Sequence, residues 1–247
     1  MDDHALASSL ASTARNLLAR LRSDGVAGPE LGREGDRQAH DLLVGLLERH
    51  RPDDAVLSEE GDPVPPGARS GRLWIIDPLD GTREYCDRRD DWAVHVALAE
   101  RGELTAGAVA LSSGDTHSTA SPVPLPAPAD RRLRVAVSRS HRPPLVDELA
   151  GVLDVQPVPM GSAGVKAVAV CTGRVDAYVH AGGQYQWDSA APVAVALAAG
   201  AHASRLDGTP LDYRSSDPRT EDLLVCRPEV APALLDALAG LRSSARG

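Results

Sequence analysis

The spacing of hydrophobic residues in the first half of the chain predicts two helices followed by antiparallel strands. Leucine and alanine recur at three- and four-residue intervals over residues 3–21, which is the pattern of an amphipathic helix. The same pattern returns from Ala39 to Leu47. Asp36, just before it, predicts a second helix that starts near this acid after a glycine-rich loop. Apolar runs then predict strands, at residues 55–57, 73–76, 92–98 and 104–111.

A proline-rich segment separates this half from one with a different pattern. Residues 112–132 include four prolines between Pro122 and Pro128, which predicts a crossover or a domain boundary. Beyond it, strands are predicted at residues 133–138, near Asp154 and at 176–180, and helices after Pro144, over 162–172, over 188–199 and from 230. This alternation favours a layered α/β half. We therefore expect an α+β half over residues 1–128 and an α/β half over residues 129–247.

Composition and charge exclude several classes of protein. The 247 residues are 43% apolar, and 26 basic side chains against 35 acidic ones give a formal net charge of -9. An acidic chain without a basic stripe is a poor partner for nucleic acid. No apolar run reaches the roughly 18 residues that a membrane span needs, and the first residues lack the charge pattern of a secretory signal. We expect a cytoplasmic protein that binds neither nucleic acid nor membranes.

Candidate metal-binding chemistry lies in the segment DPLDGT, which runs from Asp77 to Thr82 after the strand predicted at 73–76. Two carboxylates three residues apart across a tight turn can face the same space, and the carbonyl of Leu79 can join them. Hard divalent cations prefer such oxygen ligands. Gly81 and Thr82 would begin a helix and offer N–H groups and a hydroxyl to a phosphate. The alternative is an ordinary strand-to-helix turn with an aspartate cap.

Two further acidic positions lie at predicted element ends. Glu59 and Glu60 follow the strand at 55–57, and Asp188 starts an alanine-rich helix within WDSAA. Taken singly, adjacent glutamates are usually solvated, and Asp188 is explained by helix capping. These alternatives stay open for each motif alone.

Together, the strand-end glutamate, WIIDPLDGT and WDSAA resemble the inositol monophosphatase superfamily of Mg²⁺-dependent, lithium-sensitive phosphomonoesterases. The resemblance covers almost the whole chain. It is strongest to the CysQ type, the 3'(2'),5'-bisphosphate nucleotidases, in their actinobacterial form. Supporting stretches are GDRQAH, AVLSEE, DDWAVHVAL, VSRSH, GSAGVKAVAV and HASRLDGTPL. The resemblance implies a layered αβαβα sandwich with its site between the two halves, and a homodimer.

The resemblance also implies roles for individual residues. Five would supply ligands to two or three Mg²⁺ ions: Glu59, Asp77, Leu79 through its carbonyl, Asp80 and Asp188. Asp36 and Thr82 would activate the attacking water, and Gly81 and Thr82 would hold the scissile phosphate. Four residues would hold the rest of a nucleotide: Arg139, Ser162, Lys166 and His180. Lys166 is the only lysine beside 25 arginines, so a generic positive charge does not explain it.

The implied activity is hydrolysis of 3'-phosphoadenosine 5'-phosphate to AMP and phosphate by metal-activated water, which would remove a by-product of sulfate assimilation. A phosphatase of the same superfamily acting on inositol 1-phosphate or fructose 1,6-bisphosphate is the nearest alternative. A catalytically silent metal and nucleotide sensor is an alternative of another class, as is a carboxylate-pair glycosidase. The presence of the four acids with Asp36 and Thr82 favours an enzyme. The Gly-Thr pair after Asp80 suits a phosphate better than a sugar ring.

Overall fold

The first half of the chain forms a five-stranded sheet covered on its outer face by two helices. The computed structural model describes residues 1–23, 27–65, 71–129, 132–140 and 144–244. In this part of the chain the first sheet has the strand order β1-β2-β3-β4-β5. Its strands are β1 (Ala55–Ser58), β2 (Arg72–Asp80), β3 (Ala93–Glu100), β4 (Glu103–Leu111) and β5 (Thr116–Ser118), and its outer helices are α1 (Asp3–Leu21) and α2 (Gly28–His50).

The second half forms another five-stranded sheet, of order β7-β6-β8-β10-β9. Its strands are β6 (Leu133–Ser138), β7 (Val155–Met160), β8 (Ala177–Tyr185), β9 (His202–Ser204) and β10 (Arg219–Cys226). The remaining helices are α3 (Thr82–Cys86), α4 (Pro144–Val152), α5 (Ala163–Cys171), α6 (Gln186–Ala198) and α7 (Ala231–Ser244), with a short 3-10 helix at Pro228–Val230. No helix in the described ranges is both long and apolar enough to cross a membrane.

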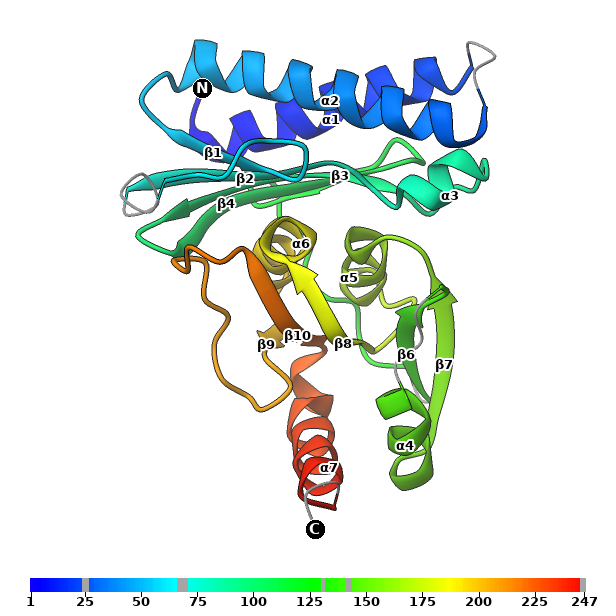
Figure 1. Ribbon diagram of the computed structural model, residues 1–247. Helices are drawn as coiled ribbons and strands as arrows, with labels where there is room; N and C mark the ends of the chain where they lie inside the picture. The colour runs from blue at the N-terminus through cyan, green and yellow to red at the C-terminus, as the bar shows by residue number, and fades with distance from the viewer. Residues whose placement is uncertain (24–26, 66–70, 130–131, 141–143, 245–247) are drawn as a thin grey trace.

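Helices and sheets alternate in layers (Figure 1). Helices α1 and α2 cover the outer face of the first sheet, α5 and α6 lie between the sheets, and α4 and α7 lie beyond the second sheet. This arrangement confirms the expected αβαβα sandwich. The division into units at residues 128 and 129 stays a prediction.

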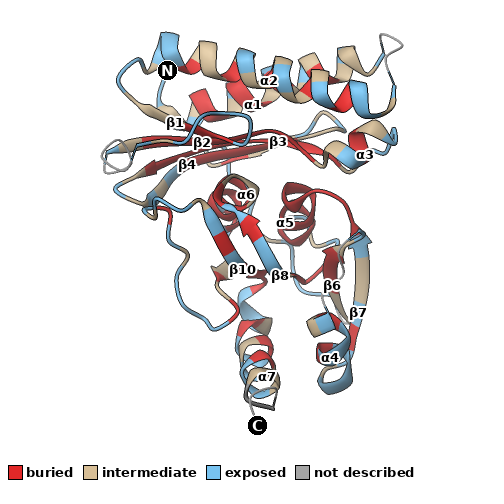
Figure 2. Cartoon of the chain, in the orientation of Figure 1, coloured by how far each residue is buried: buried red, intermediate tan, exposed pale blue. Residues whose placement is uncertain are grey.

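Both faces of the first sheet are buried. Val94, Val96 and Leu98 of β3 belong to the core formed with α1 and α2, whereas Ala93 and Ala97 belong to the core formed with α5 and α6. Strand β3 is accordingly buried along almost its whole length (Figure 2). A polar side chain in this strand therefore has to find its partners inside the protein.

Helix α2 starts earlier than the sequence pattern predicts. It begins at Gly28, so Asp36 lies inside the helix and the prediction of a first-turn acid after a glycine-rich loop is wrong. Gly32 and Gly35 instead allow α2 to pack closely against α3. A Cβ on Gly32 would lie 2.7 Å from Cys86 Sγ and 2.9 Å from Thr82 Cγ2, and a Cβ on Gly35 would lie 3.1 Å from the Tyr85 ring. The missing side chains let α2 approach α3 closely enough to bring Asp36 to Thr82.

The sequence pattern does not predict three of the strands, β5, β9 and β10. Strand β5 lies inside the predicted proline-rich linker and pairs with β4. Strands β9 and β10 follow α6 in a stretch for which no strand was expected, and β10 runs antiparallel to β8. The second sheet is therefore mixed, because β6 and β8 are parallel. Of the VSRSH stretch, His141 lies outside the described residues.

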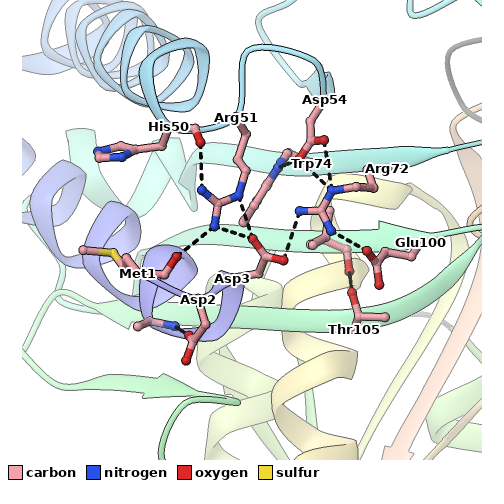
Figure 3. Close-up of polar contacts among 12 residues, drawn as sticks. Met1, Asp2, Asp3, His50, Arg51, Asp54, Arg72, Trp74, Glu100 and Thr105 are labelled. Atoms are coloured by element: carbon pink, nitrogen blue, oxygen red, sulfur yellow. Dashed lines mark hydrogen bonds and ion pairs between the residues drawn. The ribbon is translucent and has the colours of Figure 1, made fainter.

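A group of ion pairs anchors the edge of the first sheet to α1 (Figure 3). The Arg72 guanidinium donates to Asp54 at 2.9 Å and to Asp3 at 3.0 Å, and it also pairs with Glu100. Arg51 donates to the same Asp3 carboxylate at 2.8 Å. Because these side chains are partly buried and linked as a network, they hold β1 and β2 in register better than isolated surface pairs would.

Candidate active site

An irregularity in strand β2 brings two carboxylates to the same side. Asp77 pairs with His95 and Asp80 pairs with Ala93, so β2 has one more residue than β3 over this stretch. In a regular strand, residues three apart face opposite sides, and one extra residue returns them to the same side. The strand continues through Asp80, so the predicted tight turn after Asp77 is wrong. A bulge produces the arrangement that the turn was expected to produce.

Asp188 joins these two carboxylates from the other half of the chain. Carboxylate oxygens of Asp77, Asp80 and Asp188 all lie within 4.8 Å of one another. Asp188 is the third residue of α6, not its N-cap, and its Oδ2 accepts a hydrogen bond from the Tyr185 N–H at 2.6 Å. It therefore closes the helix end and faces the cluster, so the capping and the ligand interpretations are compatible.

The charges in this cluster oppose one another. Burial and the carboxylates of Glu59, Asp80 and Asp188 raise the pKa of Asp77 well above its usual value. Desolvation, followed by Asp188 and Asp36, raises the pKa of Glu59 to about 8, although Glu59 is exposed at the edge of the site. Burial and Asp80 raise the pKa of Asp188 to about 6. Crowded carboxylates with a buried oxygen donor set fit a hard divalent cation.

Asp80 is held in place by donors from the second half. Its Oδ2 accepts hydrogen bonds from the Ser162 hydroxyl and from the Gly164 N–H, the latter at 2.9 Å. Burial alone would raise the pKa of Asp80, but the positive charges of His95 and Lys166 outweigh it and lower this pKa to about 2. Asp80 is therefore the member of the cluster that ionises most readily in the absence of metal.

Asp36 and Thr82 are neighbours, although the sequence separates them widely. Burial and the nearby Glu60 raise the pKa of Asp36 to about 7, and a hydrogen bond with the Thr82 side chain acts in the opposite direction. The Thr82 Oγ1 also lies 3.1 Å from the Leu79 carbonyl oxygen, which is the alternative acceptor for its single hydrogen. Gly81, with φ of 90°, makes the left-handed step that starts α3 at Thr82.

A cavity of about 340 Å³ extends from this cluster between the two halves. Asp80, Gly81 and Asp188 line one part of it, and residues of β6, α5 and β8 line the rest. Four of the predicted substrate-binding residues border this cavity: Gly81, Ser162, Lys166 and His180. The acidic cluster thus opens into a space bounded by both halves.

Lys166 is not a surface lysine. Its side chain is only 4% exposed, and Nζ donates to the Ser162 carbonyl at 2.7 Å and lies 5.1 Å from the centre of the Tyr178 ring. Burial lowers the pKa of Lys166, while Asp80 and Glu84 act to raise it. The ammonium adds positive charge to the cavity wall within electrostatic range of Asp80 and Asp188.

Arg139 has a different environment. It pairs with Glu84 at 3.3 Å and with Asp91, both from the first half, and the described lining of the cavity does not include it. Its guanidinium therefore joins the two halves through Asp91 and through Glu84, which lines the cavity.

His95 is a site residue that the sequence interpretation missed. It is fully buried, with Nε2 3.1 Å from Asp80 Oδ2 and Nδ1 3.1 Å from the Trp187 carbonyl. It thus contacts both Asp80 of strand β2 and the start of α6. The available signal was a single histidine in an otherwise apolar strand, but its partners come from distant segments.

Comparisons with known proteins agree with this geometry. The family model of the inositol monophosphatase family matches residues 30–241. A Mycobacterium tuberculosis protein named 3'-phosphoadenosine 5'-phosphate phosphatase is 52% identical over 219 residues, covering 85% of this chain and 82% of the relative. A Mycobacterium leprae protein of the same name is 46% identical over 259 residues, covering 96% of this chain and 94% of the relative.

A solved structure supports the fold independently. The crystal structure of Staphylococcal IMPase-II superposes with a TM-score of 0.79 at 22% identity, covering 98% of this chain and 97% of that one. At this identity the likeness concerns the fold. Because the family model and both mycobacterial relatives span most of its length, the chain belongs to the inositol monophosphatase family.

Proposed function

We propose that the chain is a Mg²⁺-dependent phosphomonoesterase that hydrolyses 3'-phosphoadenosine 5'-phosphate to AMP and phosphate. The observation that carries the proposal is the cluster of Asp77, Asp80 and Asp188, which opens into a cavity walled by Lys166. The names of the two mycobacterial relatives support this substrate. We propose that the protein acts as a cytoplasmic homodimer.

The proposed metal ligands are the three clustered aspartates, Glu59 and the Leu79 carbonyl. Their oxygens match the preference of Mg²⁺ for hard ligands, and the raised pKa values of Asp77, Glu59 and Asp188 indicate that positive charge is needed there. Two or three Mg²⁺ ions bound at these residues would neutralise phosphate oxygens and supply a nucleophilic water at neutral pH.

The roles of Asp36 and Thr82 follow from their hydrogen-bonding capacity. A threonine hydroxyl has one hydrogen and two lone pairs. When that hydrogen points to Asp36 or to the Leu79 carbonyl, a lone pair remains to accept a hydrogen bond from a water molecule. With its pKa near 7, Asp36 can hold the proton that this water loses. The pair would thus orient the water and accept its proton.

The remaining residues would hold the substrate. The N–H groups of Gly81 and Thr82 at the start of α3 would bind oxygens of the scissile phosphate. Lys166, His180 and Ser162 would contact the rest of the nucleotide from the cavity wall. We propose that Arg139 exchanges its partners for the second phosphate.

A panel of substrates tests the proposal against its alternatives. Phosphate release would be measured with 3'-phosphoadenosine 5'-phosphate, inositol 1-phosphate and fructose 1,6-bisphosphate, with Mg²⁺ and after chelation. We expect a preference for the nucleotide and no turnover without metal. A preference for either sugar phosphate would identify the alternative activity. No phosphate release from any of the three substrates with Mg²⁺ would favour the catalytically silent sensor.

A further inference from the structure

A bulge near the end of β8 changes the direction of the last side chain of the strand. Between Ala181 and Gln184, β8 has two residues where β10 has one. These two residues are Gly182 and Gly183, with φ of 105° and 87°. A Cβ on Gly182 would have nothing within 4 Å, so the backbone conformation, not crowding, requires glycine there.

The bulge places Tyr185 on the cavity side of the sheet. Tyr185 pairs with Arg219 of β10, and Leu223 and Val225 share the face of Arg219 because side chains alternate along a strand. Leu223 and Val225 in turn pair with His180 and Tyr178. Tyr178, His180 and Tyr185 therefore lie on one face, and all three line the cavity.

Tyr185 is also prepared for a stacking contact. Its ring is parallel to that of Trp187 within 6°, with the centres 4.6 Å apart, so one face is covered. The residue remains 43% exposed, which leaves the other face available to a planar group. Its backbone N–H donates to Asp188 at 2.6 Å, which ties the main chain of Tyr185 to the acidic cluster.

We propose that Tyr185 is the platform on which the purine ring of the substrate stacks, and that it gives the site its preference for a nucleotide over a sugar phosphate. The inference rests on the proposed function and adds a residue to it. A base stacked on an aromatic ring gains affinity through apolar contact without needing a matched hydrogen-bond pattern. Backing by Trp187 fixes the ring before the base arrives, so little side-chain freedom is lost on binding.

The test compares Tyr185→Leu, which removes the ring, with Tyr185→Phe, which keeps it. Leu197→Ala is the matched control, since Leu197 is 50% exposed on α6 and does not border this cavity. For Tyr185→Leu we expect kcat/KM for 3'-phosphoadenosine 5'-phosphate to fall about 5- to 150-fold, mainly through KM. In the same variant, kcat/KM for 3'-phosphouridine 5'-phosphate should fall less, because a pyrimidine offers a smaller stacking surface than a purine.

Two readouts separate stacking from a structural effect. Hydrolysis of inositol 1-phosphate, which has no base, should be unchanged within about twofold in Tyr185→Leu, because only stacking energy is removed. AMP binding, followed by quenching of tryptophan fluorescence, should weaken in Tyr185→Leu and persist in Tyr185→Phe. Thermal unfolding of each variant checks that the fold is retained.

The failures are distinguishable. Equal losses on the nucleotide and on inositol 1-phosphate would mean that Tyr185 acts through Asp188, and the inference would be wrong. Unchanged nucleotide kinetics in Tyr185→Leu would also overturn it. A wild-type protein that prefers inositol 1-phosphate would instead overturn the proposed function itself.

Discussion

The Ser162 hydroxyl donates a hydrogen bond to the Asp80 carboxylate, and this contact joins the two halves of the chain at the acidic cluster. Ser162 also caps α5, where its Oγ accepts a hydrogen bond from the Val165 N–H at 3.0 Å. It adopts a φ of 50°, which is uncommon for a residue other than glycine. The orientation of a first-half carboxylate therefore depends on a helix start in the second half.

Ser162→Ala should weaken both the cap and the cluster. We expect a loss of about 0.5–2 kcal/mol in unfolding free energy from the cap. We also expect Mg²⁺ affinity to fall about 10- to 100-fold, because Asp80 loses a donor that orients it. Denaturant unfolding and Mg²⁺ titration would measure the two effects. Asp2→Ala is the matched control, since Asp2 caps α1 far from the site and should cost stability alone. Unaltered Mg²⁺ affinity in Ser162→Ala would contradict this role.

Asp80→Asn should abolish activity while the protein stays folded. An amide is similar in size but lacks the charge that a carboxylate supplies to a cation. We expect turnover to fall by more than about 100-fold, with loss of Mg²⁺ affinity. Phosphate release and metal titration would be compared with wild type. Near-normal Mg²⁺-dependent turnover in the folded variant would show that DPLDGT is a structural element.

Asp36→Asn should separate turnover from metal binding. Because Asp36 interacts through Thr82, its loss should remove proton acceptance without removing a ligand. We expect turnover to fall about 10²- to 10⁴-fold, the range of general acid–base catalysis. Mg²⁺ affinity should change much less than in Asp80→Asn. If titration gave equal losses of Mg²⁺ affinity in the two variants, Asp36 would be a ligand.

Mg²⁺ should stabilise the protein more at high pH than at low pH. Without metal, the pKa values of Asp188 and Glu59 are raised to about 6 and about 8, so the folded state retains protons that the unfolded state has released. Stability of the metal-free protein should therefore fall as pH rises from about 4 to about 8. A cation replaces those protons and removes this loss.

The measurement is the increase in Tm on adding saturating Mg²⁺ at matched ionic strength, at pH 5 and at pH 8. We expect the increase to be at least about 3 °C larger at pH 8, which corresponds to roughly 1 kcal/mol for a chain of this size. Asp80→Asn should reduce the difference. An equal Mg²⁺ effect at both pH values would indicate that the cluster does not bind the ion.

Local patterns were sufficient for a layered α/β second half and for the aspartates of the candidate site, whereas the complete sandwich was implied by the family resemblance. Helical spacing over residues 3–21 and apolar runs in β2 to β4 and β6 are short-range signals. The structure contains a helix or strand at each of these places. DPLDGT and WDSAA likewise contain the aspartates that meet in the cluster, and each motif can be recognised because it lies within one short segment. The motif residues could thus be identified without knowing where they meet.

Long-range contacts decided the geometry. The early start of α2 depends on Gly32 and Gly35 packing against α3, and composition alone favours a loop for a glycine-rich stretch. The bulge in β2 exists only in register with β3, and the one in β8 only in register with β10. His95 becomes a site residue because Asp80 and the Trp187 carbonyl arrive from other elements. Each of these features needs partners far apart along the chain, and pairing between distant segments leaves no periodic trace in either segment alone.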